Sequence, residues 1–224
     1  MHRFVIIVAG GSGQRMACSV PKQFLKINDE IILMKSISAF HKFDPNIKII
    51  IALPKDHITY WEDLCSKNNF IIDHLIALGG KTRYHSVKNA LEKISGDGIV
   101  AIHDGVRPLV NLETIEQVFE IATINGNAIP YIDLIDSIRY VDDGINKPAD
   151  RNKYKLIQTP QAFDIKLIKR AYEQGWEETF TDDASVVEKL GININLVPGN
   201  RENIKITSQI DLKLAEFLSH YLSA

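Results

Sequence analysis

Short apolar runs alternate with longer amphipathic segments along most of this chain. The apolar runs predict β-strands over Phe4–Ala9, Lys48–Leu53, Ile71–Leu78, Ile99–His103 and Ala128–Tyr131. The segments between them predict helices over Ile32–Phe43, Ile58–Lys67, Ser86–Ile94 and Leu112–Ile124. This alternation is typical of an α/β fold with a mostly parallel sheet. We therefore expect a Rossmann-like, twisted sheet with helices on both faces, within a single domain that spans residues 1–224.

The segment after Ser208 has the pattern of an amphipathic helix with a defined start. Ser208 and Asp211 have the spacing of a capping box, in which side chains bond to the backbone at the first turn of a helix. Apolar residues then recur on one helical face, at Ile210, Leu214, Phe217, Leu218 and Leu222. The chain is therefore expected to end in a helix.

Residues 132–158 depart from the alternation of strands and helices. Ile132–Val141 is β-like, Asp142-Asp143-Gly144 is typical of a turn, and Lys155–Gln158 has the pattern of a returning strand. No helix pattern separates them. We expect an antiparallel hairpin that protrudes from the sheet. It either folds onto its own domain or acts as a dimerisation arm.

A glycine-rich loop follows the first predicted strand. Gly10, Gly11 and Gly13 let the backbone turn tightly and come close to a ligand, because no Cβ stands in the way. Exposed N–H groups in such a loop attract anions, and Arg15 and Lys22 add two positive charges. The loop therefore predicts a triphosphate site. The alternative is a strand-to-helix turn whose glycines serve geometry alone.

The composition is that of an ordinary globular protein. The 224 residues are 45% hydrophobic and 24% charged, and the net charge of −2 gives no reason to expect a nucleic-acid surface. No apolar run is long enough for a membrane span or a signal-peptide core. Cys18 and Cys65 fit no metal or redox spacing. We expect a cytoplasmic protein with reduced thiols and no nucleic-acid or membrane partner.

Seven short motifs occur in order along the chain. They are the glycine loop with Arg15 and Pro21–Gln23, then Gly79–Ser86, His103–Pro108, Asp150–Asn152, Gln158–Gln161, Thr181–Ala184 and Asn203–Thr207. With these motifs the chain resembles the cytidylyltransferases that act on polyol phosphates, in particular the 2-C-methyl-D-erythritol 4-phosphate cytidylyltransferase family. The resemblance extends from Val8 to Phe217.

The resemblance implies a set of site residues. Transition-state stabilisation would fall to Arg15, Lys22 and Lys205. Nucleotide binding would fall to Ala9, Gly10, Gly11, Gly13, Gly80, Ser86 and Asp104, with Asp104 also holding Mg²⁺. The acceptor phosphate would be bound by Arg107, Arg151, Thr159 and Thr181. In the family the positions of Arg151 and Thr159 reach the active site of the other protomer, so the resemblance also implies a homodimer.

The sequence itself describes the setting of some of these residues. Asp104 follows the apolar run Ile99–Ile102, so it is expected at the C-terminal end of a strand, where open α/β sheets bind ligands. The alternative is a helix N-cap or a turn carboxylate. Lys205 lies in the strand-like run Ile204–Thr207, and the alternative is a lysine that faces water. His103 is expected to be a packed strand residue, in preference to a catalytic base.

The implied reaction is transfer of the cytidylyl group of CTP to 2-C-methyl-D-erythritol 4-phosphate, with release of pyrophosphate, in non-mevalonate isoprenoid biosynthesis. Three residues depart from the family's common pattern: Lys81 stands where many relatives have aspartate, and Gly105 and Val106 stand where alanines are common. A valine before Arg-Pro is frequent in ribitol-5-phosphate cytidylyltransferases, which are the nearest alternative. An alternative of another class is a non-catalytic nucleotide-binding protein.

Overall fold

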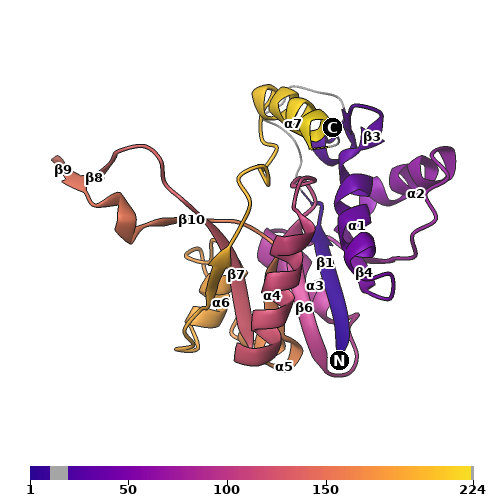
Figure 1. Ribbon diagram of the computed structural model, residues 1–224. Helices are drawn as coiled ribbons and strands as arrows, with labels where there is room; N and C mark the ends of the chain where they lie inside the picture. The colour runs from indigo at the N-terminus through magenta and orange to yellow at the C-terminus, as the bar shows by residue number, and fades with distance from the viewer. Residues whose placement is uncertain (11–19, 223–224) are drawn as a thin grey trace.

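The described part of the chain, residues 1–10 and 20–222 of a computed structural model, is built around a central sheet with helices on both faces (Figure 1). The strands of this sheet are β1 (His2–Val8), β4 (Lys48–Leu53), β5 (Leu75–Leu78), β6 (Gly98–Asp104), β7 (Asn127–Asp133), β10 (Lys155–Ile157), β11 (Gln161–Asp164) and β12 (Leu196–Pro198). Within the described residues the strand order is β10-β7-β11-β6-β1-β4-β5, and β12 pairs with β7. The neighbours β6, β1, β4 and β5 are parallel, as the sequence predicts.

The helices pack against the sheet, and the last element in the described residues is also a helix. They are α1 (Ile32–Phe43), α2 (Ile58–Lys67), α3 (Arg83–Leu91), α4 (Leu112–Asn125), α5 (Ile165–Ala171), α6 (Asp183–Glu188) and α7 (Gln209–Tyr221). The bounds of α1 and α2 are those predicted from the sequence. The predicted capping box of Ser208 and Asp211 is also present at the start of α7. None of the helices in the described residues has the length and apolar character needed to cross a bilayer.

Alternate residues of the central strands pack on opposite faces of the sheet. Val5 and Ile7 of β1 belong to a core with residues of α1, α2 and α4. Phe4 and Ile6 of the same strand belong to a second core with residues of α3, α5 and α6. Because side chains point to opposite faces along a strand, each helical layer receives every second residue. The expected arrangement of helices on both faces is therefore confirmed.

One short strand makes the sheet mixed. β11 lies between β6 and β7 and is antiparallel to both. It brings Gln161 level with Ile102, close to the carboxyl end of β6. Neither β11 nor the helix α5 that follows it was predicted from the sequence.

Two predicted strands differ from the structure. The strand expected over Ile71–Leu78 is confined to β5, since only its second half pairs with β4. The strand expected over Ile204–Thr207 is wrong, because these residues have no regular secondary structure. The backbone N–H of Ile206 instead donates to the carbonyl of Val106, in the loop after β6. This contact draws the segment across the carboxyl edge of the sheet.

A hairpin stands away from the sheet, as predicted (Figure 1), but its returning strand is not the predicted segment Lys155–Gln158. Its strands are β8 (Ile138–Asp142) and β9 (Ile145–Ala149), which pair only with each other in the described residues. Asp143 and Gly144 join them with positive φ angles of 39° and 81°, the backbone that a tight hairpin turn requires. The chain then returns through β10, which pairs with β7. A smaller pair, β2 (Lys26–Ile27) and β3 (Glu30–Ile31), precedes α1.

Candidate active site

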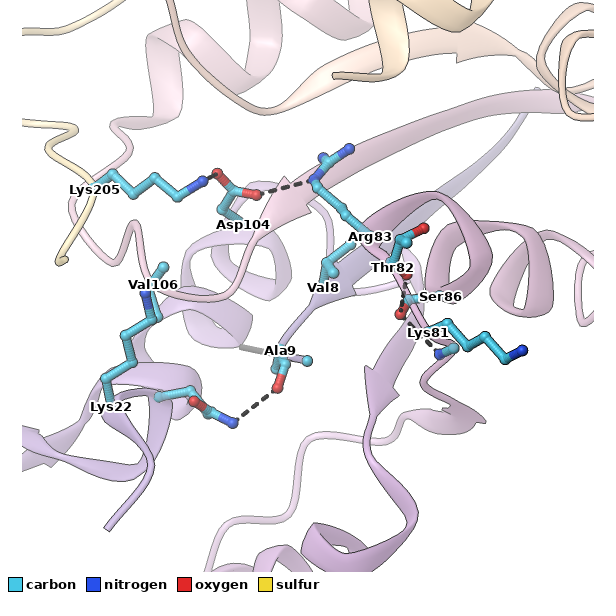
Figure 2. Close-up of a pocket in the computed structure, with 13 residues that line it drawn as sticks. Val8, Ala9, Lys22, Lys81, Thr82, Arg83, Ser86, Asp104, Val106 and Lys205 are labelled. Carbon is cyan, nitrogen blue, oxygen red and sulfur yellow. Dashed lines mark hydrogen bonds and ion pairs between the residues drawn. The ribbon is translucent and has the colours of Figure 1, made fainter. Parts of the chain in front are cut away.

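A cavity of about 360 Å³ opens at the carboxyl ends of β1 and β6. Among the described residues, those that line it are Val8, Ala9, Gly10, Lys22, Gln23, Gly80, Lys81, Thr82, Arg83, Ser86, Asp104, Val106 and Lys205 (Figure 2). Ligands of open α/β sheets bind at this edge, because the loops that follow adjacent parallel strands meet there. The cavity therefore collects most of the predicted nucleotide and catalytic residues that the structure describes.

Asp104 is the last residue of β6 and lies among three cations. Its Oδ2 is 2.8 Å from Lys205 Nζ and 3.5 Å from Arg107 Nε, and its Oδ1 is 3.4 Å from Arg83 Nε. Figure 2 shows the carboxylate between Lys205 and Arg83. Burial alone would raise the pKa of Asp104, but the charges of Arg83, Lys205 and Arg107 outweigh burial and hold this pKa well below its usual range. Asp104 is therefore a carboxylate at any physiological pH.

The segment that carries Lys205 is held by buried amides. Asn203 is fully buried, and its side chain donates to the carbonyl of Thr159 over 2.8 Å. Its own carbonyl accepts a hydrogen bond from Arg107 Nη1 at 2.7 Å. The contact of Ile206 with the loop after β6 fixes the other side of Lys205. The lysine thus reaches Asp104 from an irregular segment that is held by hydrogen bonds on both sides of Lys205.

A second wall of the cavity is formed at the start of α3. The backbone N–H of Gly80 donates to Ser86 Oγ at 3.0 Å, and the Ser86 hydroxyl donates to the carbonyl of Thr82 at 3.0 Å. A Cβ on Gly80 would lie 2.3 Å from the Cβ of His85, so only glycine fits here without a shift. The structure therefore brings the predicted nucleotide residues Gly80 and Ser86 into direct contact.

The opposite wall follows β1. Gln23 is buried, and its side-chain amide donates to the carbonyl of Ala9 at 2.8 Å. This contact fixes the short 3-10 helix Lys22–Phe24 against the end of β1, so that Lys22 lines the cavity (Figure 2). Gly10 lines it as well. The remaining predicted residues of the loop, Gly11, Gly13 and Arg15, lie outside the described residues.

Thr159 and His103 form a chain of hydrogen bonds beneath Asp104. The N–H of Asp104 donates to Thr159 Oγ1 at 3.1 Å, and Thr159 Oγ1 lies 3.1 Å from His103 Nδ1. His103 Nε2 lies 3.0 Å from the carbonyl of Arg107. Burial of the imidazole is the main cause that lowers its pKa to about 4. His103 is thus neutral and packed, as predicted.

The four predicted acceptor residues occupy different places. Arg107 lies beside Asp104, but its Nη1 is used by Asn203. Thr159 is buried against Asp104 of its own chain, which corrects the expectation that this side chain reaches a partner's site. Arg151 is exposed at the root of the arm and donates to the carbonyl of Ile135. Thr181 is exposed just before α6. Of the four, Arg107 and Thr159 thus contact Asp104, whereas Arg151 contacts the backbone at Ile135.

Arg83 lines the cavity, although no role was predicted for it from the sequence. Arg83 donates to both carboxylate oxygens of Asp183, from Nη1 at 2.9 Å and from Nη2 at 2.7 Å. Tyr172 donates to the same carboxylate at 2.6 Å. Arg83 and Asp183 both lie within quoted motifs, but their separation along the chain hides the pair.

The residues around Asp104 offer few ligands for a magnesium ion. Among the described residues no three His, Cys, Asp or Glu side chains form a group that could hold a metal by themselves. Asp104 is the one carboxylate among the described residues that line the cavity. Mg²⁺ is commonly held by one or two carboxylates together with substrate phosphates and water. The donor set therefore fits Mg²⁺ that arrives with a polyphosphate, and does not fit a preformed metal cage.

The fold and the cavity define the class of protein. It is an α/β protein with a cation-rich pocket at the carboxyl edge of its sheet, and this pocket is suited to a polyphosphate. Residues 3–220 match the family model of IspD, 2-C-methyl-D-erythritol 4-phosphate cytidylyltransferase. The chain therefore belongs to this family of nucleotidyltransferases.

Individual relatives agree with this assignment. The 2-C-methyl-D-erythritol 4-phosphate cytidylyltransferase of Bacteroides fragilis is 50% identical over 97% of this chain and 100% of its own length. That of Phocaeicola vulgatus is 49% identical, with the same coverage. The crystal structure of 4-diphosphocytidyl-2C-methyl-D-erythritol synthase from Anaerococcus prevotii superposes with a TM-score of 0.85 at 28% identity, over 100% of this chain and 96% of that one.

Proposed function

We propose that this protein transfers the cytidylyl group of CTP to 2-C-methyl-D-erythritol 4-phosphate and releases pyrophosphate, a step of non-mevalonate isoprenoid biosynthesis. Membership of the family supports the reaction. The observation that carries it within the chain is the contact of Lys205 with Asp104, both of which line a cavity of about 360 Å³. A fixed cation beside the end of a strand is what an α-phosphate in transfer needs.

The chemistry requires no protein nucleophile. An oxygen of the acceptor phosphate forms a bond to the α-phosphorus of CTP, and the bond from that phosphorus to the bridging oxygen of pyrophosphate breaks. Both reactants are anions, so the protein's task is to align them and to stabilise charge on the α-phosphate and the leaving group. We assign Lys205 to the α-phosphate, and Arg15 and Lys22 to the leaving pyrophosphate. His103 takes no part as a base, because it is buried and used by Thr159 and Arg107.

The nucleoside end of CTP is assigned to the opposite wall. Ser86 and the backbone of Gly80 would face the cytosine and its ribose, and Ala9 and Gly10 would face the phosphates. Asp104 would bind the ribose region and hold Mg²⁺ together with phosphate oxygens. When bound, Mg²⁺ neutralises charge on the triphosphate. The carboxylate of Asp104 suits this task because it stays ionised among Arg83, Arg107 and Lys205.

We also propose a cytoplasmic homodimer in which the arm, residues 132–158, contacts the partner. The hairpin exposes apolar side chains, with Val141 71%, Ile145 52% and Tyr140 42% accessible. A two-stranded hairpin with little other support is marginal in water, and pairing with a symmetry mate would bury these side chains. The acceptor phosphate would then be bound by Arg107 and Thr181 of one protomer and by Arg151 from the arm of the other.

The test is a pyrophosphate-release assay with Mg²⁺, in which CTP or UTP is combined with 2-C-methyl-D-erythritol 4-phosphate or ribitol 5-phosphate. We expect release with CTP and methylerythritol phosphate and little release with UTP, because a site built around hydrogen bonds leaves polar groups unpaired with the wrong base. Val106, which lines the cavity, makes ribitol 5-phosphate the necessary comparison. Release with ribitol 5-phosphate alone would replace the proposed acceptor. No release with either acceptor, despite CTP binding, would favour the non-catalytic alternative.

A further inference from the structure

The ion pair of Arg83 with Asp183 joins two of the motifs, and the proposed reaction gives neither of these two residues a role. Arg83 is the first residue of α3, and Asp183 is the first residue of α6. Thr82 and Asp182 cap these helices with their side chains, so each charged residue has a fixed starting point. The two Arg83 contacts, at 2.7 and 2.9 Å, form a bidentate fork. Such a fork fixes the plane of the guanidinium group as well as its position.

Asp183 is a buried carboxylate at the start of α6. Its side chain is fully inaccessible, and its carboxylate accepts bonds from Arg83 and Tyr172. Its backbone N–H donates to Gln161 Oε1 at 3.0 Å, which ties the start of α6 to β11. A buried ion pair is weak evidence for stability, because desolvation offsets much of the attraction. An orienting role explains why a charged pair stands where apolar residues would pack.

Arg83 connects the buried Asp183 carboxylate to the Asp104 carboxylate in the cavity. While Nη1 and Nη2 hold Asp183, the remaining nitrogen, Nε, lies 3.4 Å from Asp104 Oδ1. The opposite oxygen of Asp104 faces Lys205 at 2.8 Å. Figure 2 shows Arg83 and Lys205 on opposite sides of this carboxylate. Its two oxygens are therefore held by groups from different elements, which sets the rotation of the carboxylate.

We propose that Asp183 and Arg83 are positioning residues. Asp183 holds the Arg83 guanidinium, and Arg83 holds the Asp104 carboxylate in the orientation in which it binds the nucleotide. This inference rests on the proposed function, because in that function Asp104 binds a nucleotide. The fork matters as much as the charge. A lysine has one nitrogen, so it cannot contact Asp183 through two atoms and Asp104 through a third.

The experiment compares Arg83→Gln, Arg83→Lys, Asp183→Asn and the double variant Arg83→Gln/Asp183→Asn. Replacement of an outer-shell residue that orients a metal ligand typically costs about 10–100-fold in metal affinity or activity, and Asp104 is the residue assigned to Mg²⁺. We expect losses of this size in kcat/KM for CTP with Arg83→Gln and Asp183→Asn, and a loss with Arg83→Lys close to that of Arg83→Gln. Since the two residues act as one unit, the double variant should be no worse than Arg83→Gln alone.

Tyr172→Phe is the matched control. It removes the other side-chain donor to Asp183 and leaves the contact with Arg83 in place. We expect a lower melting temperature for this variant, with kcat and KM within about twofold of wild type. An Asp183→Asn variant that has a lower melting temperature than the wild type but keeps wild-type kcat/KM would overturn the proposal. So would multiplicative losses in the double variant, or full activity in Arg83→Lys.

CTP binding to each variant is also measured by calorimetry, without an acceptor. This measurement separates the inference from the proposed function. If the wild-type protein binds CTP but releases no pyrophosphate with methylerythritol phosphate, the proposed acceptor is wrong, and the ratio of CTP affinities still reports on Arg83 and Asp183. If Asp183→Asn does not fold, the two Arg83 variants decide the matter, because Arg83 has 27% of its side chain exposed and lies at the cavity wall.

Discussion

Lys205 Nζ lies 2.8 Å from Asp104 Oδ2, and the backbone next to Lys205 is bonded to the loop that follows Asp104. The two residues are distant in sequence, yet one contact between side chains and one between backbones place them together. A triphosphate that enters the cavity therefore meets a lysine that is already positioned. Because Asp104 and Lys205 form an ion pair, a nucleotide that binds here must place its own charged group beside this pair.

Replacement of Lys205 by alanine should slow the transfer step much more than it weakens CTP binding. A preorganised charge that acts in the transition state is worth about 10²–10³ in kcat, and we expect a loss in this range. Steady-state kinetics and CTP titration measure the two effects separately. Lys213→Ala, which changes an exposed lysine of α7, is the control and should leave both unchanged. A Lys205→Ala variant with wild-type kcat and only weaker CTP binding would make Lys205 a ground-state contact.

Gly80→Ala should weaken CTP binding and lower stability together. The new Cβ would lie 2.3 Å from His85 Cβ and 2.9 Å from the His85 carbonyl carbon, so the start of α3 must move. Overpacking of this kind costs about 1–3 kcal/mol. The shift would break the 3.0 Å bond of Gly80 N–H to Ser86 Oγ. Thermal melting and CTP calorimetry test both effects, and unchanged CTP affinity would show that the Gly80 backbone is not part of the nucleotide site.

Stability should fall in acid in two separate windows. Burial lowers the pKa of His103 from 6.5 to about 4, so between these values the unfolded chain binds a proton that the folded chain does not. Stability is therefore lost as pH falls through this window, by up to about 1.4 kcal/mol per pH unit. Asp104 has a pKa below its usual 3.8, so its contribution is lost only in more acidic solution.

Chemical denaturation between pH 7 and pH 4 measures the first of these windows. A His103→Gln variant should show a shallower decline than the wild type, although it is less stable at pH 7. His220→Gln, a change of an exposed histidine on α7, should follow the wild-type curve. Equal slopes for the wild type and His103→Gln would rule out His103 as the source of the decline.

Mixing of two inactive variants tests the shared site of the proposed dimer. Lys22 lines the cavity of its own chain, whereas Arg151 is exposed at the root of the arm. When Lys22→Ala and Arg151→Ala chains exchange, about half of the dimers are mixed, and each mixed dimer holds one site with both residues intact. Roughly a quarter of wild-type activity should therefore return. No recovery, with exchange verified by native mass spectrometry, would place both residues in one chain's site.

Local sequence signals predicted the elements that depend on neighbours in the chain. The bounds of α1 and α2 follow from helical periodicity, and the cap of α7 follows from Ser208 and Asp211. Elements that depend on distant partners were missed. β11 has only four residues, and it is a strand because β6 and β7 lie on either side of it. Conversely, Ile204–Thr207 alternates like a strand but has no strand to pair with.

The same distinction applies to the site. The motif residues Asp104 and Lys205 were expected near one cavity, and the structure brings them into contact. The partners that orient them could not be read from the sequence. Arg83 and Asp183 come from two helices on one face of the sheet, and only the packing of those helices makes the pair. Thr159 was expected to reach the active site of the other protomer, because nothing in its motif shows that the Asp104 backbone needs an acceptor.

The charges that line the cavity have a consequence for the speed of nucleotide capture. Among its described lining residues, Lys22, Lys81, Arg83 and Lys205 are cationic and Asp104 is the one carboxylate, in a chain whose net charge is −2. Electrostatic attraction reaches only about 8 Å at physiological ionic strength. The attraction of these cations for a nucleotide is therefore largely confined to the surroundings of the cavity. Lys81, which is exposed and points away from Asp104 in Figure 2, extends that attraction outward from the mouth. We therefore expect added salt to slow the association of CTP, because it screens the attraction of these cations.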